Sequence, residues 1–294
     1  MMDSSSWISF RYLLDRCEER KKGALLPFLS LEQQEKLKQI KASEKDPFSR
    51  CYSTKERVHG VHYSWLITFL EPFAEQDKTT ILSALEKPQA QKLKNYFQLK
   101  ENLIPLKSKA KEYLISAVYK WLISEQKEFL PIEFLPEHPL NPLLNLSKGK
   151  LQKLVDFLGL HDLALEMKHI IKSEQIKKIQ KVLPKEKQDY LKSLLKIKKH
   201  LSFTRLNLDG WDGDGEKLKA ILHHRGFNRL AKALFGCHPS LLWHICHKLD
   251  TGRAKILRKF FTNINNEEAQ AVLTKQVVEL IPTVQKSNEY RIGS

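Results

Sequence analysis

Two stretches of this chain repeat one pattern at a fixed separation. Residues 64–97 read SWLITFLEPFAEQDKTTILSALEKPQAQKLKNYF, and residues 228–261 read NRLAKALFGCHPSLLWHICHKLDTGRAKILRKFF. Aligned without a gap, 164 positions apart, they pair Leu66 with Leu230, Leu70 with Leu234, Ile81 with Ile245, Leu85 with Leu249, Ala90 with Ala254, Leu93 with Leu257, and Tyr96-Phe97 with Phe260-Phe261. Matches at i, i+4 and i+7 are core positions of helices, so the recurring unit is a small helical hairpin.

A third copy lies 67 positions before the second. Leu151, Leu154, Gly159, Leu163, Ala164, Val182 and Tyr190 stand where Leu218, Ile221, Gly226, Leu230, Ala231, Leu249 and Leu257 stand. Units of this kind bury their apolar faces against their neighbours. We therefore predict an all-α fold of armadillo-like helical hairpin modules, in two or three stacked units. The 164-residue repeat further predicts equivalent long helices over residues 78–97 and 241–261.

The composition is that of a globular protein. Of its 294 residues, 41% are hydrophobic and 29% charged, which argues against a disordered chain. Four cysteines, Cys17, Cys51, Cys237 and Cys246, are too few and too scattered for a disulfide framework, so we expect a reducing compartment. We find neither a secretory signal nor a long apolar run. These features predict a cytoplasmic protein without a transmembrane segment.

Breaks in the helical pattern predict four parts. They are an N-terminal helical module (1–105), a helix with a proline-rich linker (106–145), a middle helical module (146–205) and a C-terminal helical module (206–294). Residues 130–142 read LPIEFLPEHPLNP and form a linker or a strapped crossing between domains, because each proline removes a donor and restricts its predecessor. We interpret Phe134 and Leu135 within it as candidate partner-binding residues.

The positive charge of the chain is unevenly distributed. Lys and Arg exceed Asp and Glu by 16, and residues 172–200 hold ten lysines and three acids. The segment is either a solvated helix face or a dock for an acidic partner, an anionic membrane surface or nucleic acid. Lys177, Lys178 and Lys181 are its candidate binding residues. We find no sequence signature of an RNA-recognition domain, so we expect protein partners rather than nucleic acid.

Two clusters of potential ligands fail the spacing tests for metal sites. The aspartates of residues 207–216 do not match the spacing of a calcium loop, and we interpret them as a turn that caps the following helix. Cys237, His238, His244, Cys246 and His247 lack the tight cysteine pair of zinc sites. There is no glycine-rich phosphate loop and no nucleophile motif. We predict no catalytic residue, no metal and no cofactor.

Residues 151–195 and 217–261 resemble the C-terminal armadillo-like part of the flagellar motor switch protein FliG. The resemblance is carried by Asp162-Leu163-Ala164, by Leu230-Ala231-Lys232-Ala233-Leu234-Phe235-Gly236 and by Arg253-Ala254-Lys255-Ile256-Leu257. The torque face of that family has a Lys where this chain has Phe235, and acids where it has Arg258 and Lys259. A face without those acids lacks the charge pairs to a stator, so the resemblance implies a scaffold rather than a rotating motor.

The chain is also similar to the SctK family, the sorting-platform adaptors of type III secretion machines. Glu137-His138-Pro139 resembles the motif with which the switch protein binds its ring partner, although Leu140 replaces the final Gln of that motif. The resemblance implies a non-enzymatic scaffold, peripheral to the inner membrane, that links a membrane ring to cytoplasmic ring or pod proteins. Arg253, Arg258 and Lys259 are further candidate contacts. The alternative is a basic helical-repeat adaptor that binds nucleic acid or an anionic membrane surface.

Overall fold

The structure is a computed structural model of an all-α protein. It describes residues 4–40, 52–170, 173–197, 201, 205, 206, 208 and 210–286, and these residues contain no strand. The predicted fold class is thereby confirmed, while the armadillo-like arrangement stays a prediction. Cys51, Lys172, Lys198, Lys199 and Asp209, which the sequence singled out, lie outside the described residues.

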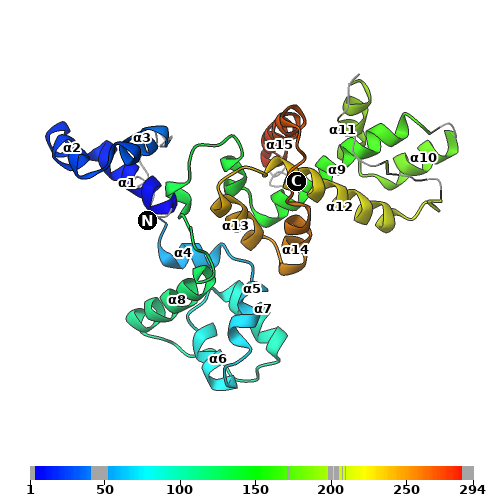
Figure 1. The fold of residues 1–294 in the computed structure, drawn as a ribbon. Coiled ribbons are helices and arrows are strands. Elements are labelled where there is room, and N and C mark those ends of the chain that lie inside the picture. The colour runs from blue at the N-terminus through cyan, green and yellow to red at the C-terminus, as the bar shows by residue number, and fades with distance from the viewer. Residues whose placement is uncertain are drawn as a thin grey trace. The chain divides into compact units, whose positions relative to one another are not determined.

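The chain divides into two compact units (Figure 1). One unit comprises Met1–His138 and Cys237–Thr251, and the other comprises Pro139–Gly236 and Gly252–Ser294. Each unit therefore draws on two separate segments of the chain. Segment Cys237–Thr251 has its contacts in the first unit, whereas the sequence grouped it with residues 206–294.

The first unit is built around one main core. Its helices are α1 (Ser4–Arg16), α2 (Glu19–Leu25), α3 (Leu31–Gln39), α4 (Thr54–His59), α5 (Trp65–Leu70), α6 (Glu75–Leu82), α7 (Lys87–Phe97), α8 (Ser108–Ile123) and α13 (Pro239–Lys248), with 3-10 turns η1 (Leu26–Phe28) and η2 (Ile132–Phe134). Ser30 and Ser53 begin α3 and α4 as capping boxes. Trp243 of α13 belongs to the same core as residues of α4 to α8, so a helix from the C-terminal half completes this unit.

The second unit centres on two long helices that pack against each other. It contains η3 (Asn141–Asn145), α9 (Lys148–Met167), α10 (Ser173–Val182), α11 (Lys185–Leu195), α12 (Gly215–Ala233), α14 (Thr251–Phe260) and α15 (Glu267–Lys286). Ser147 caps α9, and the Asp214 carboxylate accepts from the first amides of α12. The prediction that the aspartate turn caps the helix after it is therefore confirmed.

The helix boundaries follow the sequence repeats. Helices α6 and α7 begin 164 residues before α13 and α14, and α9 begins 67 residues before α12. Four of the aligned pairs are completely buried on both sides: Leu66 and Leu230, Leu70 and Leu234, Ala90 and Ala254, Leu93 and Leu257. Phe97 and Phe261 are half-buried, whereas Tyr96 is exposed. We call α9–α10–α11 and α12–α13–α14 the two triplets.

The predicted continuous helices over 78–97 and 241–261 are wrong, because each is two helices. Pro88 lies in the first turn of α7, where its missing N–H and its ring prevent a helix from running through it. The second break has no proline. Leu249 is extended, and its carbonyl accepts a hydrogen bond from the Trp65 indole at 2.9 Å. A tertiary contact, which periodicity does not encode, accompanies that break.

Helices α9 and α12 cross with their backbones in contact. A Cβ on Gly159 would lie 2.1 Å from the carbonyl oxygen of Leu222, and one on Gly226 would lie 1.8 Å from that of Val155. The two contacts are reciprocal, because Val155 and Gly159 stand 67 positions before Leu222 and Gly226. The two triplets thus meet through equivalent faces, as in a twofold interface.

We expect Gly226→Ala to lower the free energy of unfolding by about 3 kcal/mol, because the added methyl group would force α9 and α12 apart. Gly149→Ala is the matched control, since a Cβ at Gly149 of α9 meets nothing within 4 Å. It should leave stability unchanged or raise it by up to about 1 kcal/mol. Urea unfolding measures both variants. Equal stability of Gly226→Ala and wild type would contradict the close crossing.

Candidate interaction surfaces

Helix α13 is tied to the proline-rich linker by polar contacts inside the first unit. The hydroxyl of Ser240 accepts from the amide of Leu130 at 2.8 Å and donates to the carbonyl of Glu128 at 3.2 Å. His244 Nε2 donates to the carbonyl of Leu130 at 3.0 Å. The amide and the carbonyl of Leu130, just before the first proline, therefore both form hydrogen bonds with side chains of α13, which lies more than 100 residues away in sequence.

The histidines and cysteines of residues 237–247 have packing roles. The ring of His247 stacks between Trp65, with ring centres 4.1 Å apart, and Trp243, at 3.8 Å. Cys237 Sγ lies 3.5 Å from His138 Nε2, and burial raises the pKa of Cys237 to about 11, so it is a thiol at neutral pH. Among the described residues, no three His, Cys, Asp or Glu side chains are placed to hold a metal ion.

The linker is packed rather than free along its first half. Leu135 is 4% exposed, and the ring of Phe134 lies edge-on to Tyr12 at 5.7 Å. The buried Glu133 carboxylate accepts from Arg57 Nη2 at 2.9 Å. Leu135 consequently has little surface left for a partner. Its sequence pattern, an apolar residue between prolines, did not distinguish a packed strap from an interface.

The motif at residues 137–139 is more accessible. Glu137 and Pro139 are exposed, and His138 is half-buried, which lowers the pKa of its imidazole. In the second unit, Pro139 lines a groove of about 520 Å³ together with side chains of α15, among them Gln270 and Val278. These residues could touch a partner without any rearrangement of the core.

Acidification should destabilise the first unit through His244. Burial lowers the pKa of His244 to about 4, although its hydrogen bond to Leu130 opposes the shift. The unfolded chain therefore binds a proton between pH 6.5 and 4 that the folded chain does not, so this share of stability is present above pH 6.5 and is lost as the pH falls. The loss is about 3 kcal/mol.

In His244→Gln, the amide can still donate to Leu130, but it does not titrate. Between pH 7 and pH 4, the free energy of unfolding should fall in both proteins, and the fall should be about 3 kcal/mol smaller in the variant than in the wild type. Urea unfolding at both pH values measures the difference. The same pH dependence in both proteins would show that His244 is not the buried neutral group described here.

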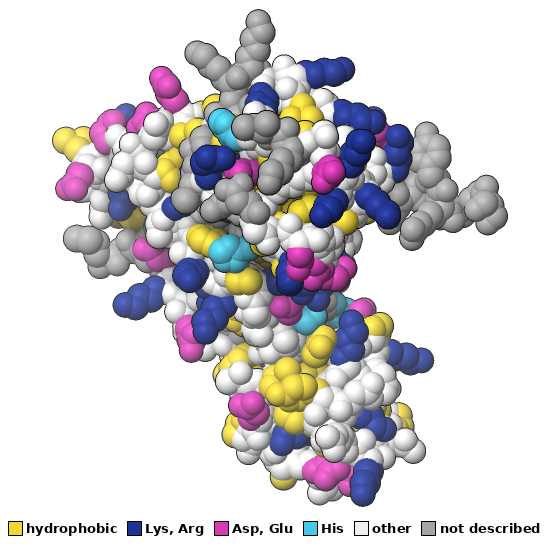
Figure 2. All heavy atoms as spheres, turned by 90° about the vertical axis from the view of Figure 1, so that its right-hand side faces the viewer, with side chains coloured by type: hydrophobic (Ala, Val, Ile, Leu, Met, Phe, Trp, Pro, Cys, Tyr) yellow, Lys and Arg dark blue, Asp and Glu magenta, His cyan; other side chains and the backbone are white. Residues whose placement is uncertain are grey.

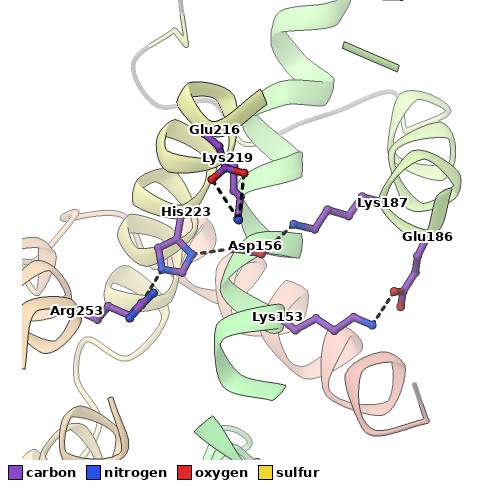
Figure 3. Close-up of polar contacts among 8 residues, drawn as sticks. All are labelled: Lys153, Asp156, Glu186, Lys187, Glu216, Lys219, His223 and Arg253. Carbon is purple, nitrogen blue, oxygen red and sulfur yellow. Dashed lines mark hydrogen bonds and ion pairs between the residues drawn. The ribbon is translucent and has the colours of Figure 1, made fainter. Parts of the chain in front are cut away.

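Four side chains from four helices form a line of hydrogen bonds in the second unit, which we call the Asp156 cluster (Figure 3). Asp156 of α9 accepts from Lys187 Nζ of α11 at 2.8 Å and from His223 Nδ1 of α12 at 2.7 Å. Arg253 Nε of α14 donates to His223 Nε2 at 3.2 Å. Burial alone would raise the pKa of Asp156, but the hydrogen bonds from His223 and Lys187 lower it below its usual value.

The Asp156 cluster joins helices and leaves its histidine no free nitrogen. Arginine only donates, so Nε2 of His223 accepts and Nδ1 carries the proton that is donated to Asp156. An aspartate–histidine pair acts as a general base only when the second nitrogen can take a proton from a nucleophile. Here Arg253 occupies that nitrogen, so the geometry is that of a structural link among α9, α11, α12 and α14.

Further charged contacts hold the same unit together. Arg229 of α12, which is buried, donates to Asp162 of α9 at 2.6 Å and to Gln276 at 3.0 Å. Lys153 pairs with Glu186 at 2.6 Å. The sequence singled out Arg253 but missed Asp156, His223 and Asp162. A signal did exist: Asp156 and His223, like Asp162 and Arg229, occupy equivalent positions 67 residues apart.

The predicted basic contacts do not form one site. Lys177, Lys178 and Lys181 are exposed on α10, and Arg258 and Lys259 are exposed on α14, whereas Arg253 lies in the Asp156 cluster. Figure 2 shows dark blue Lys and Arg side chains over much of one side of the molecule, with magenta acidic side chains among them. The positive charge is therefore a spread surface in which α10 is one defined patch.

An aromatic surface on α8 was missed as a site. Tyr113 is 74% exposed and Trp121 is 37% exposed, two helical turns further along the same face. Phe69 lies beside Trp121, with ring centres 5.0 Å apart. Helical periodicity predicts that Tyr113 and Trp121 share a face, but it does not show that Ile115, Val118 and Leu122 are the residues of α8 that are buried in the core.

Comparison with known proteins leaves the family open. No protein-family model matches the chain, no curated protein matches it, and no solved structure matches it. Among the described residues, no helix is both long and apolar enough to cross a membrane.

Proposed function

We propose that this chain is a non-enzymatic helical scaffold of a flagellar-type (type III) protein secretion machine. In this role it lies in the cytoplasm at the inner membrane and links a membrane ring to cytoplasmic ring or pod proteins. It reaches the membrane through protein partners. We infer the type of machine from the sequence resemblance to FliG and to the SctK family. The arrangement of the repeated helices supports a scaffold role.

The observation that carries the proposal is the pair of equivalent triplets. The two segments that resemble FliG, residues 151–195 and 217–261, coincide with α9–α10–α11 and α12–α13–α14. Their long helices cross reciprocally at Gly159 and Gly226. Repeated helical units of this kind present extended surfaces to other proteins. The Asp156 cluster contains an aspartate–histidine pair like those of catalytic machinery, but Arg253 occupies the second nitrogen of its histidine, and we interpret it as a structural link.

One observation favours the alternative of a basic adaptor for nucleic acid or an anionic membrane. The chain has a net charge of +16, and Lys177, Lys178 and Lys181 are exposed together on α10. Binding of that kind depends on phosphate charge and falls steeply with salt. Contacts between protein subunits through an apolar core persist at high salt, so salt separates the two functions.

The test is deletion of the gene in its host, followed by a secretion assay. We expect secreted substrates to disappear from the medium and to return when the full chain is supplied. The tagged chain should retain ring and pod proteins at about 0.5 M salt. Normal secretion in the deletion strain would overturn the proposal, and recovery of nucleic acid or lipid that disappears at that salt concentration would favour the alternative.

A point variant tests the accessible motif. Glu137→Lys reverses an exposed charge beside Pro139, and Glu125→Lys makes the same charge change at an exposed residue that follows α8. If residues 137–139 contact the ring, Glu137→Lys should reduce recovery of the ring protein by about tenfold, equivalent to about 1.4 kcal/mol, and Glu125→Lys should not. Equal recovery with both variants would remove the motif from the interface.

A further inference from the structure

Helix α10 occupies the place in its triplet that α13 occupies in the other. Each is the short helix that follows the long one, and the 67-residue alignment places Val182, the end of α10, on Leu249 at the end of α13. Seven of the ten residues of α13 are buried, with Trp243 in the core of the first unit, whereas only Ile179 of α10 is buried. The same element of the repeat is therefore covered in one triplet and open in the other.

The inner side of α10 is firmly seated in the second unit. Ile179 is completely buried, and Gln175 Nε2 donates to the carbonyl of Leu208 at 2.6 Å. Val182 packs against Gly215 so closely that a Cβ there would lie 2.8 Å from its Cγ1. The outer side of α10 is thus presented on a fixed support and need not be ordered when a partner binds.

The outer side of α10 carries three exposed lysines. Lys177, Lys178 and Lys181 are exposed, and none has an ion pair or hydrogen bond to a described residue. Other lysines of this unit do have acidic partners: Lys153 pairs with Glu186, Lys185 and Lys192 with Asp189, Lys187 with Asp156, Lys217 with Asp212, and Lys219 with Glu216. The lysines of α10 have no such ion pair, although Glu174 lies one helical turn before Lys178 on the same helix.

The unmatched lysines cost stability in the free protein. Lys177 and Lys181 are one helical turn apart, and like charges at this spacing destabilise a helix. An acidic surface would turn this repulsion into attraction and would speed association. Stacking with nucleic-acid bases has less support, because Tyr190, the aromatic residue of α10 and α11, is bonded to His161 at 3.0 Å and packs on Phe157.

We propose that α10 docks onto an acidic helical surface of a protein partner through Lys177, Lys178 and Lys181. The docking corresponds to that of α13, which is covered by helices of the first unit, but charge replaces the aromatic stack. The proposal rests on the scaffold function, because it places the partner among the subunits that the chain recruits.

The experiment places a photo-crosslinking residue, benzoylphenylalanine, at Gln180, which is exposed between the lysines, and at the equally exposed Gln76 as a control. The full chain is expressed in its host and irradiated. We expect an adduct from Gln180 alone, whose partner peptide lies in a helix rich in Asp and Glu. An adduct with nucleic acid or lipid only, or with a peptide that lacks acids, would overturn the proposal.

Charge reversal then tests the lysines themselves. Lys177→Glu, Lys178→Glu and Lys181→Glu together should lower the adduct yield by about tenfold or more. Lys100→Glu, Lys109→Glu and Lys120→Glu make the same total change at exposed lysines of the first unit and should leave the yield unchanged. Lysines substituted for the acids of the crosslinked partner helix should restore the adduct with the reversed α10. Undiminished yield from the reversed α10 contradicts docking through these lysines.

Two controls keep the outcomes separate. Urea unfolding should show unchanged stability, because exposed charges contribute little to folding; if the Glu variant unfolds, the same three positions changed to Gln, a good helix former, replace it. An adduct with an acidic protein outside any secretion machine would support the docking and overturn the proposed function. Loss of secretion on deletion, without an adduct, would support the function and overturn the docking.

Discussion

The backbone contact of α9 with α12 is the constraint on which the second unit depends. Gly159 and Gly226 leave no space for a side chain between the two helices, so their backbones pack directly against each other. Because each residue of one contact stands 67 positions from its equivalent in the other contact, the same packing arrangement occurs twice. A twofold relation of this kind halves the number of different contacts that the sequence has to specify.

Polar interactions beside the crossing use the same equivalence. Asp156 meets His223 and Asp162 meets Arg229, so each of these pairs joins equivalent positions of α9 and α12. The buried Arg229–Asp162 pair is satisfied further by Gln276, which limits the cost of burying charge and brings α15 to the pair. In the Asp156 cluster, Lys187 and Arg253 extend the line to α11 and α14. Charged hydrogen bonds thus link α11, α14 and α15 to α9 and α12, whose close crossing depends on Gly159 and Gly226.

The two triplets show how one pattern acquires two roles. Helix α13 packs against Trp65, Phe129 and the backbone of Leu130, and burial keeps its His244 neutral by lowering the pKa of that side chain. Helix α10 keeps its outer side in solvent and carries lysines there. The same position of the repeat is therefore a buried, stabilising helix in one triplet and a solvent-exposed helix in the other.

Helical periodicity by itself determined the all-α class, the repeat, the buried pairs such as Leu66 with Leu230, and the equivalence of Gly159 with Gly226. These follow because spacing along a helix decides which side chains share a face. Only the tertiary structure decided which hydrophobic residues find a neighbour: Leu135 of the linker is covered, whereas Tyr113 of the amphipathic helix α8 is exposed. The repeat places Asp156 and His223 at equivalent positions, but only the tertiary structure decided that they bond to each other and to Lys187 and Arg253, because packing brings the four helices together.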